Sequence, residues 1–494
     1  MSNLKKGVVS SFLLIGESIL NKLIGLVSTL VLARVLVPED FGIVAIATLT
    51  VGFFEILSNT GSVQYLLRAE KINNSEINTS WTINILLRFV LSLAIVSVSF
   101  FASDFYEDSR IQELMLVLSV IYFIEAWQNP GIIYLKRDQD YAGIVKVTLV
   151  GKVFAVCSAV SIALYFESYW ALIVGQAISK ITTLVGYYIV YPYSPKFELT
   201  NARKQWTFSG WMIPQSILGF FRTQLDTFLA SSMFGKAELG SYHTMKYLAF
   251  IPTAYLIVPM TQTFLVEMRR ASVEFINFKK LFNAAFFIAL LIAAPISTFI
   301  YYFHEVTTLV LLGENWVKYS QLLACFSLLI TSSVFYQHCA KTLIIFNKPK
   351  HLFVYEIITF ILIYAILFTV GLSDLVVFTY TRVGLEQLLS LCFLIYTSLK
   401  YTDVANLLKL LLGTFIILIS CVGSVFIVPF LVSVSYSNFP MAHLVLTALT
   451  FFTLFYAIFI LCYFLFLRRF SEWEYIYSLM LRILKPIKIK FVRD

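Results

Sequence analysis

Charged residues are scarce in this sequence. Only 13% of the residues are Asp, Glu, Lys or Arg, and 59% are hydrophobic, whereas soluble globular proteins carry roughly 25% charged residues. This scarcity excludes a soluble globular protein, because polar groups could not cover its surface. The mean hydropathy of +0.83 predicts a chain that is solvated mostly by lipid. The 46 Phe and 28 Tyr residues agree with this prediction, because aromatic side chains gather at membrane interfaces.

Several enzyme and metal-site motifs are also missing. No GxxxxGK[ST] sequence is present to hold nucleotide phosphates, and neither HExxH nor GxSxG occurs. The six cysteines lie in apolar stretches without a CxxC pair, which is typical of packing residues rather than of disulfides or metal ligands. We therefore expect no ATP site, no cofactor, no metal centre and no nucleic-acid partner.

Long apolar runs are what the sequence has instead. A helix that spans a bilayer needs about 20 mostly apolar residues, and this length predicts about fourteen spans in an all-α polytopic membrane protein. The connections between them are too short for a folded catalytic domain. The predicted spans lie near residues 11–33, 41–66, 79–102, 112–135, 142–165, 168–190, 206–231, 241–264, 279–303, 318–341, 351–371, 375–399, 406–430 and 443–467.

Lys and Arg concentrate in alternate connections. One set holds pairs such as Lys136 with Arg137 and Arg269 with Arg270, whereas the other set is mostly acidic. Since basic residues favour the cytoplasmic side, we expect a multi-pass protein of the bacterial inner (cell) membrane with both termini in the cytoplasm. The tail at 471–494 mixes aromatic with basic residues, so we expect it to lie on anionic membrane lipid.

A weak internal repeat divides the chain. Residues 32–42 read LARVLVPEDFG and residues 229–240 read LASSMFGKAELG, at an offset of 197 to 198 residues. Transporters are often built from such related halves. The repeat predicts an N-terminal lobe of helices one to six at 1–200, a second lobe of helices seven to twelve at 201–404, and an appendage of two helices at 405–470.

The same region resembles a known family. The run LARVLVPEDFGIVAIATL, followed by FFEILSNTGSVQYLLR, closely resembles the first two helices of Wzx-type polysaccharide transporters, or O-antigen flippases, of the multidrug/oligosaccharidyl-lipid/polysaccharide superfamily. The resemblance implies two six-helix lobes in a V around a cavity, with alternating access. It implies a lipid-linked oligosaccharide on undecaprenyl pyrophosphate as cargo, for exopolysaccharide, capsule or O-antigen (lipopolysaccharide) synthesis. Other polysaccharide-assembly proteins are further candidate partners, and the charge-free stretch 410–467 suits a polyprenyl tail.

Charged residues inside the predicted spans are the candidate functional residues. Each costs about 2.5–3.5 kcal/mol on insertion scales, so each needs a partner, a wet cavity or a ligand. A basic cavity wall could bind a pyrophosphate or an acidic sugar; its candidate residues are Lys22, Arg88, Lys152, Lys180 and Arg222. The carboxylates that could exchange a coupling ion are Glu17, Glu55, Glu125, Asp226 and Glu386.

Structural ion pairs are the alternative for the same residues. Arg222 with Asp226, and Arg382 with Glu386, are four residues apart and can pair along one helix face. The basic residues of the first six helices could instead pair across helices with the three glutamates of that lobe.

The absence of a nucleotide motif predicts a secondary transporter, driven by an H⁺ or Na⁺ gradient or by the gradient of its own cargo. A drug or cation antiporter of the same superfamily is an alternative, although it would favour a more acidic cavity. A membrane polysaccharide polymerase is a second alternative. Such an enzyme usually needs a long outside loop, and the longest one here, at about 304–317, is short.

Overall fold

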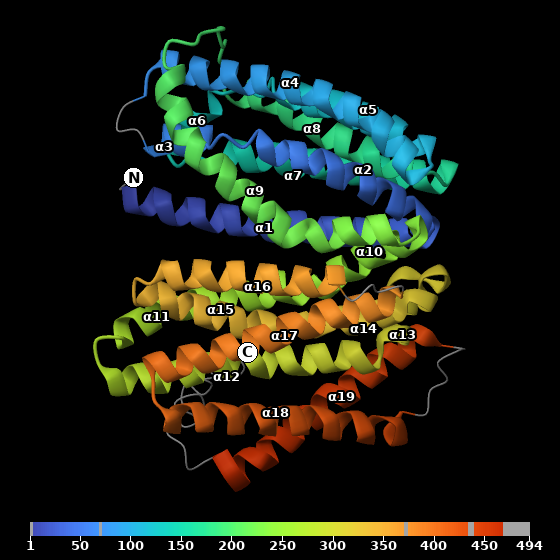
Figure 1. The fold of residues 1–494 in the computed structure, drawn as a ribbon, viewed down its shortest axis with the longest axis vertical. Coiled ribbons are helices and arrows are strands. Elements are labelled where there is room, and N and C mark those ends of the chain that lie inside the picture. The colour runs from blue at the N-terminus through green and yellow to red at the C-terminus, as the bar shows by residue number, and fades with distance from the viewer. Residues whose placement is uncertain (1–2, 69–71, 370–373, 433–438, 468–494) are drawn as a thin grey trace, which may run out of the picture. The chain divides into compact units, whose positions relative to one another are not determined.

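The chain folds into helices joined by short connections (Figure 1). A computed structural model describes residues 3–68, 72–369, 374–432 and 439–467, and none of these residues forms a strand. Helices suit an apolar chain because lipid offers no hydrogen bonds, so that every backbone N–H and C=O must be paired within the segment. The predicted all-α membrane fold is confirmed. The tail at 471–494 lies outside the described residues.

Twelve helical segments in the described part are long and apolar enough to span a bilayer. Two further predicted spans correspond to α5 (Ser109–Glu125), which has only 17 residues, and to α9 (Ala202–Met233), which carries several charged and polar residues. The protein is therefore a multi-pass membrane protein, and the count of fourteen spans stays a prediction.

Packing divides the chain into two compact units, Met1–His243 and Thr244–Asp494. The lobe boundaries at 200 and 404, which follow from the sequence repeat and the helix count, stay a prediction. The first unit holds α5, α9, the start of α10 (Lys236–Pro252), and α1 (Asn3–Val35), α2 (Pro38–Leu57), α3 (Ser62–Arg68), α4 (Asn74–Tyr106), α6 (Ile132–Arg137), α7 (Ala142–Phe166) and α8 (Trp170–Val190).

The second unit begins within α10 and contains the remaining helices. These are α11 (Val258–Ala271), α12 (Phe275–Tyr302), α13 (His304–Leu312), α14 (Ser320–Ser327), α15 (Leu329–Ile345), α16 (Pro349–Thr369), α17 (Leu375–Tyr401), α18 (Val404–Leu431) and α19 (Pro440–Cys462), with short π or 3-10 turns at Thr253–Ile257, Glu314–Tyr319 and Tyr463–Leu467.

Two predicted spans of the first unit are broken helices. The segment 41–66 divides into α2 and α3, with Gly61 in the left-handed region (φ 67°) between them. The segment 112–135 divides into α5 and α6 around Asn129 and a following Pro-Gly. The amide of Asn129 donates to the carbonyl of Tyr187 at 3.0 Å, which ties this break to the end of α8. Turn-forming residues end each helix early, so each of these two predicted spans consists of two helices. The segment Pro38–Leu67 is nevertheless one of the twelve that are long and apolar enough to span a bilayer.

Aromatic residues of α12 form the core of the second unit. Phe282, Phe286 and Phe287 are fully buried, and α18 approaches so closely that a Cβ on Gly413 would lie 2.5 Å from the ring of Phe287. A π-helical turn, Thr253–Ile257, separates α10 from α11. At the end of α11, the Arg269 guanidinium donates to the Ile345 carbonyl at 3.0 Å, so that the last turn of α15 is joined to α11.

Candidate functional site

Four charged side chains from four helices meet inside the first unit. Arg88 of α4 donates to Glu125 of α5 at 2.9 Å, and Lys180 of α8 donates to the other oxygen of Glu125 at 2.6 Å. Glu55 of α2 lies 3.8 Å from Lys180. Since Lys180 stands at the midpoint of the 21-residue α8, this cluster lies deep within the membrane-spanning part of the unit. We call it the inner charge cluster.

The two helix breaks position the carboxylates of this cluster. Glu55 lies in the last turn of α2, and Glu125 is the last residue of α5. The C-terminal end of a helix carries a partial negative charge from its unpaired carbonyls, so a carboxylate there attracts cations strongly. Arg88 also interacts with the end of α5 itself. Its guanidinium donates to the Tyr122 carbonyl at 3.3 Å and lies 4.8 Å from the centre of the Tyr122 ring. Broken helices of this kind mark binding sites in many transporters.

The cluster has a buried half and an accessible half. The side chains of Arg88 and Glu125 are 14% and 15% exposed, whereas those of Lys180 and Glu55 are 38% and 49% exposed. The Lys180–Glu55 distance of 3.8 Å is also longer than that of a hydrogen-bonded ion pair. Arg88 and Glu125 therefore form a fixed pair, and Lys180 is held between a fixed carboxylate and a loosely associated one.

Further candidate residues lie along the packed pair α1 and α7. Glu17 accepts hydrogen bonds from Thr148 at 2.7 Å and from Asn21 at 3.2 Å. The Lys152 ammonium lies 3.6 Å from the position that a Cβ on Gly25 would occupy, and it makes no ion pair with any side chain that the structure describes. Lys152 is thus a cation between two helices without a fixed counter-charge among the described residues.

The remaining predicted residues lie outside the inner charge cluster. Lys22 of α1 and Arg222 of α9 are exposed. Asp226 is fully buried and accepts hydrogen bonds from the Tyr242 hydroxyl at 3.0 Å and from the Thr227 amide at 2.8 Å. In the second unit Arg382 pairs with Glu386, as their spacing predicts.

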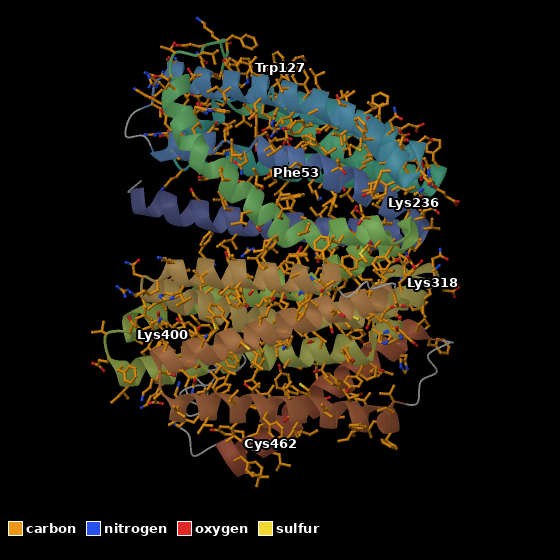
Figure 2. All side chains as sticks on the ribbon, viewed as in Figure 1. Phe53, Trp127, Lys236, Lys318, Lys400 and Cys462 are labelled. Atoms are coloured by element: carbon orange, nitrogen blue, oxygen red, sulfur yellow. The ribbon has the colours of Figure 1, made fainter. Side chains whose placement is uncertain are left out.

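A second charged group lies at the ends of α2, α5 and α10. Asp108 accepts hydrogen bonds from Lys236 at 2.8 Å and from Arg110 at 2.8 Å, and Arg110 also donates to Glu39 at 2.5 Å. Figure 2 shows Lys236 toward one end of the first unit. Burial raises the pKa of Asp108, but the hydrogen bonds from Arg110 and Lys236 outweigh it and hold that pKa well below its usual range. We call these four residues the terminal clasp.

Comparison with known proteins places the chain among polysaccharide biosynthesis proteins. A family model described as "Polysaccharide biosynthesis protein" matches residues 31–321, more than half of the chain. The lipopolysaccharide biosynthesis protein WzxC of Escherichia coli (strain K12) is 22% identical over 51% of this chain and 51% of its own length. The succinoglycan biosynthesis transport protein ExoT of Rhizobium meliloti (strain 1021) is 22% identical over 49% of this chain and 50% of its own length. The chain spans about half the length of the curated relatives it matches.

Solved structures share the fold. The lipid II flippase MurJ in an inward closed conformation has a TM-score of 0.68 at 13% identity, over 92% of this chain and 98% of that chain. An inward-facing multidrug resistance MATE transporter of the MOP superfamily has a TM-score of 0.58 at 13% identity, over 77% of this chain and 94% of that chain. The chain therefore shares the fold of these two proteins.

Proposed function

The chain belongs to the family of polysaccharide biosynthesis proteins, and on that basis we propose that it is a flippase for lipid-linked sugars. It moves oligosaccharide units linked to undecaprenyl pyrophosphate across the bacterial inner membrane, with both termini in the cytoplasm. Relatives named for lipopolysaccharide biosynthesis and for succinoglycan transport support a polysaccharide precursor as cargo. The likeness to transporter folds supports transport rather than catalysis.

The observation that carries this proposal is the position of Lys180 between two unequal carboxylates. Glu125 is bound at 2.6 Å and buried, whereas Glu55 is half exposed at 3.8 Å. A cargo diphosphate carries more negative charge than one carboxylate, so in a low-dielectric site it competes with Glu55 for the Lys180 ammonium. Lys152 offers a second cation without a fixed partner among the described residues.

Release of Glu55 couples cargo binding to an ion. When the diphosphate displaces Glu55, that carboxylate loses its cation, and once the loaded transporter faces the periplasm it can take up a proton from that side. Return of the empty transporter to the cytoplasmic side then re-forms the Lys180–Glu55 association and releases the proton into the cytoplasm. Glu125 stays paired with Arg88 throughout, since the two side chains are mostly buried and hydrogen-bonded to each other. The free energy comes from the proton gradient or from the gradient of the cargo.

The test compares the location of cargo in cells that lack the gene with that in cells that carry variants. Deletion is expected to leave lipid-linked units assembled but trapped on the inner leaflet. Lys180→Gln is expected to reproduce this defect at normal abundance, whereas Lys400→Gln, which changes an exposed lysine of the second unit, is expected to export normally. Units that reach the outer leaflet at normal levels but stay unpolymerised would instead indicate a polymerase.

A further inference from the structure

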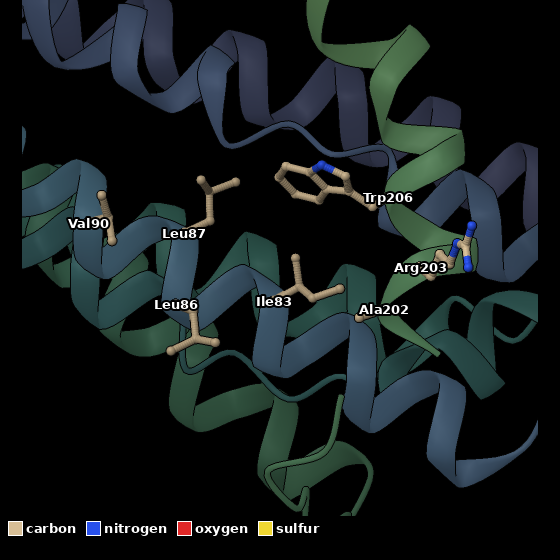
Figure 3. Close-up of a pocket in the computed structure, with 7 residues that line it drawn as sticks. All are labelled: Ile83, Leu86, Leu87, Val90, Ala202, Arg203 and Trp206. Carbon is tan, nitrogen blue, oxygen red and sulfur yellow. The ribbon is translucent and has the colours of Figure 1, made fainter. Parts of the chain in front are cut away.

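A pocket of about 510 Å³ lies between α4 and α9 in the first unit (Figure 3). Its volume falls within the range of roughly 300–1,000 Å³ that is typical of small-ligand sites. The pocket is apolar except at one end, where the first turn of α9 supplies an arginine. Its lining residues are Ile83, Leu86, Leu87, Val90, Ala202, Arg203 and Trp206.

One face of α4 forms the apolar wall. Ile83, Leu86, Leu87 and Val90 follow the spacing that places residues on one side of a helix. At 1.5 Å per residue this wall runs for about 10 Å along the helix axis. Leu86 and Val90 are exposed, so the pocket opens sideways toward the lipid rather than into the packed interior of the unit.

Positive charge gathers at one end of the pocket. Arg203 and Lys204 both lie in the first turn of α9 and both are exposed. The N-terminus of a 32-residue helix adds a partial positive charge, and Asn201 makes no side-chain hydrogen bond that would cap it. Figure 3 shows the Trp206 ring extending from α9 toward Leu87, while Arg203 points outward from the same helix.

Aromatic side chains mark this end of the pocket as the membrane interface. Trp81 lies two residues before the apolar wall on α4, with its ring 5.8 Å from that of Trp127 and 5.1 Å from that of Phe197. Trp206 is half exposed. Tryptophan prefers the level of the lipid headgroups, so the cations of α9 lie at headgroup depth and the wall of α4 extends toward the acyl chains.

We propose that this pocket is a binding site for an anionic phospholipid. One acyl chain lies along the α4 wall under Trp206, and the headgroup phosphate binds at Arg203, Lys204 and the start of α9. Basic pockets between membrane helices bind anionic headgroups in this way. A wall of about 10 Å fits part of one acyl chain, whereas a polyprenyl chain would extend far beyond it, so we assign the pocket to a membrane lipid rather than to the cargo.

Native mass spectrometry of the purified full chain tests the assignment, with phosphatidylglycerol and phosphatidylethanolamine as probes. We expect retention of one phosphatidylglycerol in preference to phosphatidylethanolamine. Arg203→Gln with Lys204→Gln should weaken retention about 25-fold, because each cation near an anionic headgroup contributes a factor of about five. Val90→Trp, which fills the pocket, should also reduce it. Lys400→Gln and Leu388→Trp, on exposed positions of α17, should leave retention unchanged.

Two results would overturn the assignment. Equal retention of both lipids, or wild-type retention by the Arg203 and Val90 variants, would show that the pocket does not select an anionic phospholipid. Displacement of phosphatidylglycerol by undecaprenyl phosphate at a similar concentration would assign the pocket to the cargo instead. Lys180→Gln should retain phosphatidylglycerol normally, so a failure of the transport proposal leaves this measurement unaffected.

Discussion

Gly42 of α2 and Gly240 of α10 meet in a reciprocal crossing. A Cβ on Gly42 would lie 1.8 Å from the carbonyl oxygen of Lys236, and a Cβ on Gly240 would lie 1.9 Å from that of Pro38. Each glycine thus faces the residue four positions before the other, and equivalent residues are 198 positions apart. The two copies of the weak sequence repeat therefore pack against each other within the first unit, and a local two-fold axis relates their contacts. Only a residue without a Cβ allows the two backbones to approach this closely.

Replacement of either glycine should separate the two helices. We expect Gly42→Ala and Gly240→Ala each to destabilise the protein by about 1–3 kcal/mol or more, because overpacking at a rigid backbone contact forces a shift. Thermal unfolding of the purified protein measures this loss. Gly384→Ala in α17 is the matched control, since a Cβ there meets nothing within 4 Å. Equal melting temperatures for all three variants would contradict the close crossing.

The terminal clasp should respond to pH in one direction. The folded-state pKa of Asp108 lies below its ordinary value, so its contribution to stability is fully present above about pH 4 and is lost as the pH falls through the folded pKa. Asp108→Asn keeps the helix cap on α5 but removes the charge. We expect it to cost about 1–3 kcal/mol near pH 7. The difference from wild type should shrink below about pH 4.

Asp374→Asn is the control for the clasp. Asp374 caps α17 through the Val377 amide at 2.9 Å, and it makes no ion pair with a described residue. Its replacement should therefore change the melting temperature little at any pH. A loss as large as that in Asp108→Asn would attribute the effect to capping rather than to the ion pairs.

Replacement of each of the two carboxylates of the inner charge cluster should have a different effect on the protein. Glu125→Gln leaves Arg88 without its buried partner, so we expect a loss of stability on the order of 3 kcal/mol and low abundance in the membrane. Glu55→Gln removes a loose, half-exposed association, so we expect normal abundance with impaired transport. Quantitative blotting together with cargo localisation separates these outcomes. Low abundance of both variants would make the whole cluster structural.

Lys22 and Lys152 test the basic cavity wall. We expect Lys22→Ala and Lys152→Ala to abolish export while the protein inserts at normal abundance, and Lys22→Arg to keep partial activity because charge matters more than shape for a mobile diphosphate. Export assays and membrane abundance are the two measurements. Degradation of both alanine variants would indicate that these lysines hold the helices together, and normal export would exclude the basic wall.

Topology reporters test the fourteen-span arrangement. Fusions after residues 104, 236 and 374 should report the periplasm, and fusions after 71, 270 and 494 should report the cytoplasm. This pattern follows from the distribution of Lys and Arg between alternate connections. A single reporter on the opposite side would break the arrangement.

The sequence was sufficient to predict the fold class, because long apolar runs with few charges have one stable solution in lipid. It also predicted the Arg382–Glu386 pair, since both residues lie on one helix. It could not say which glutamate meets Arg88, because a contact between helices depends on how each helix is rotated. The helix breaks after Glu55 and Glu125 were not predicted, although Gly61 and Asn129 indicate turns there. Counting apolar residues over a span length takes no account of turn-forming residues within the span. The terminal clasp was not predicted, since its members come from three distant parts of the chain: Glu39, the neighbouring Asp108 and Arg110, and Lys236.

The π-helical turn Thr253–Ile257 also determines which way the side chains of α11, the next helix of the same span, point around the helix axis. A π turn accommodates one extra residue, and one residue advances a helix by ~100°. Deletion of Ala254 would restore a regular α-helix without changing the apolar character of the segment. Yet it would rotate the end of α11 by that angle and turn Arg269 away from the Ile345 carbonyl that it now binds. In this span the orientation of the side chains of α11 therefore depends on the number of residues before them, and not only on their polarity.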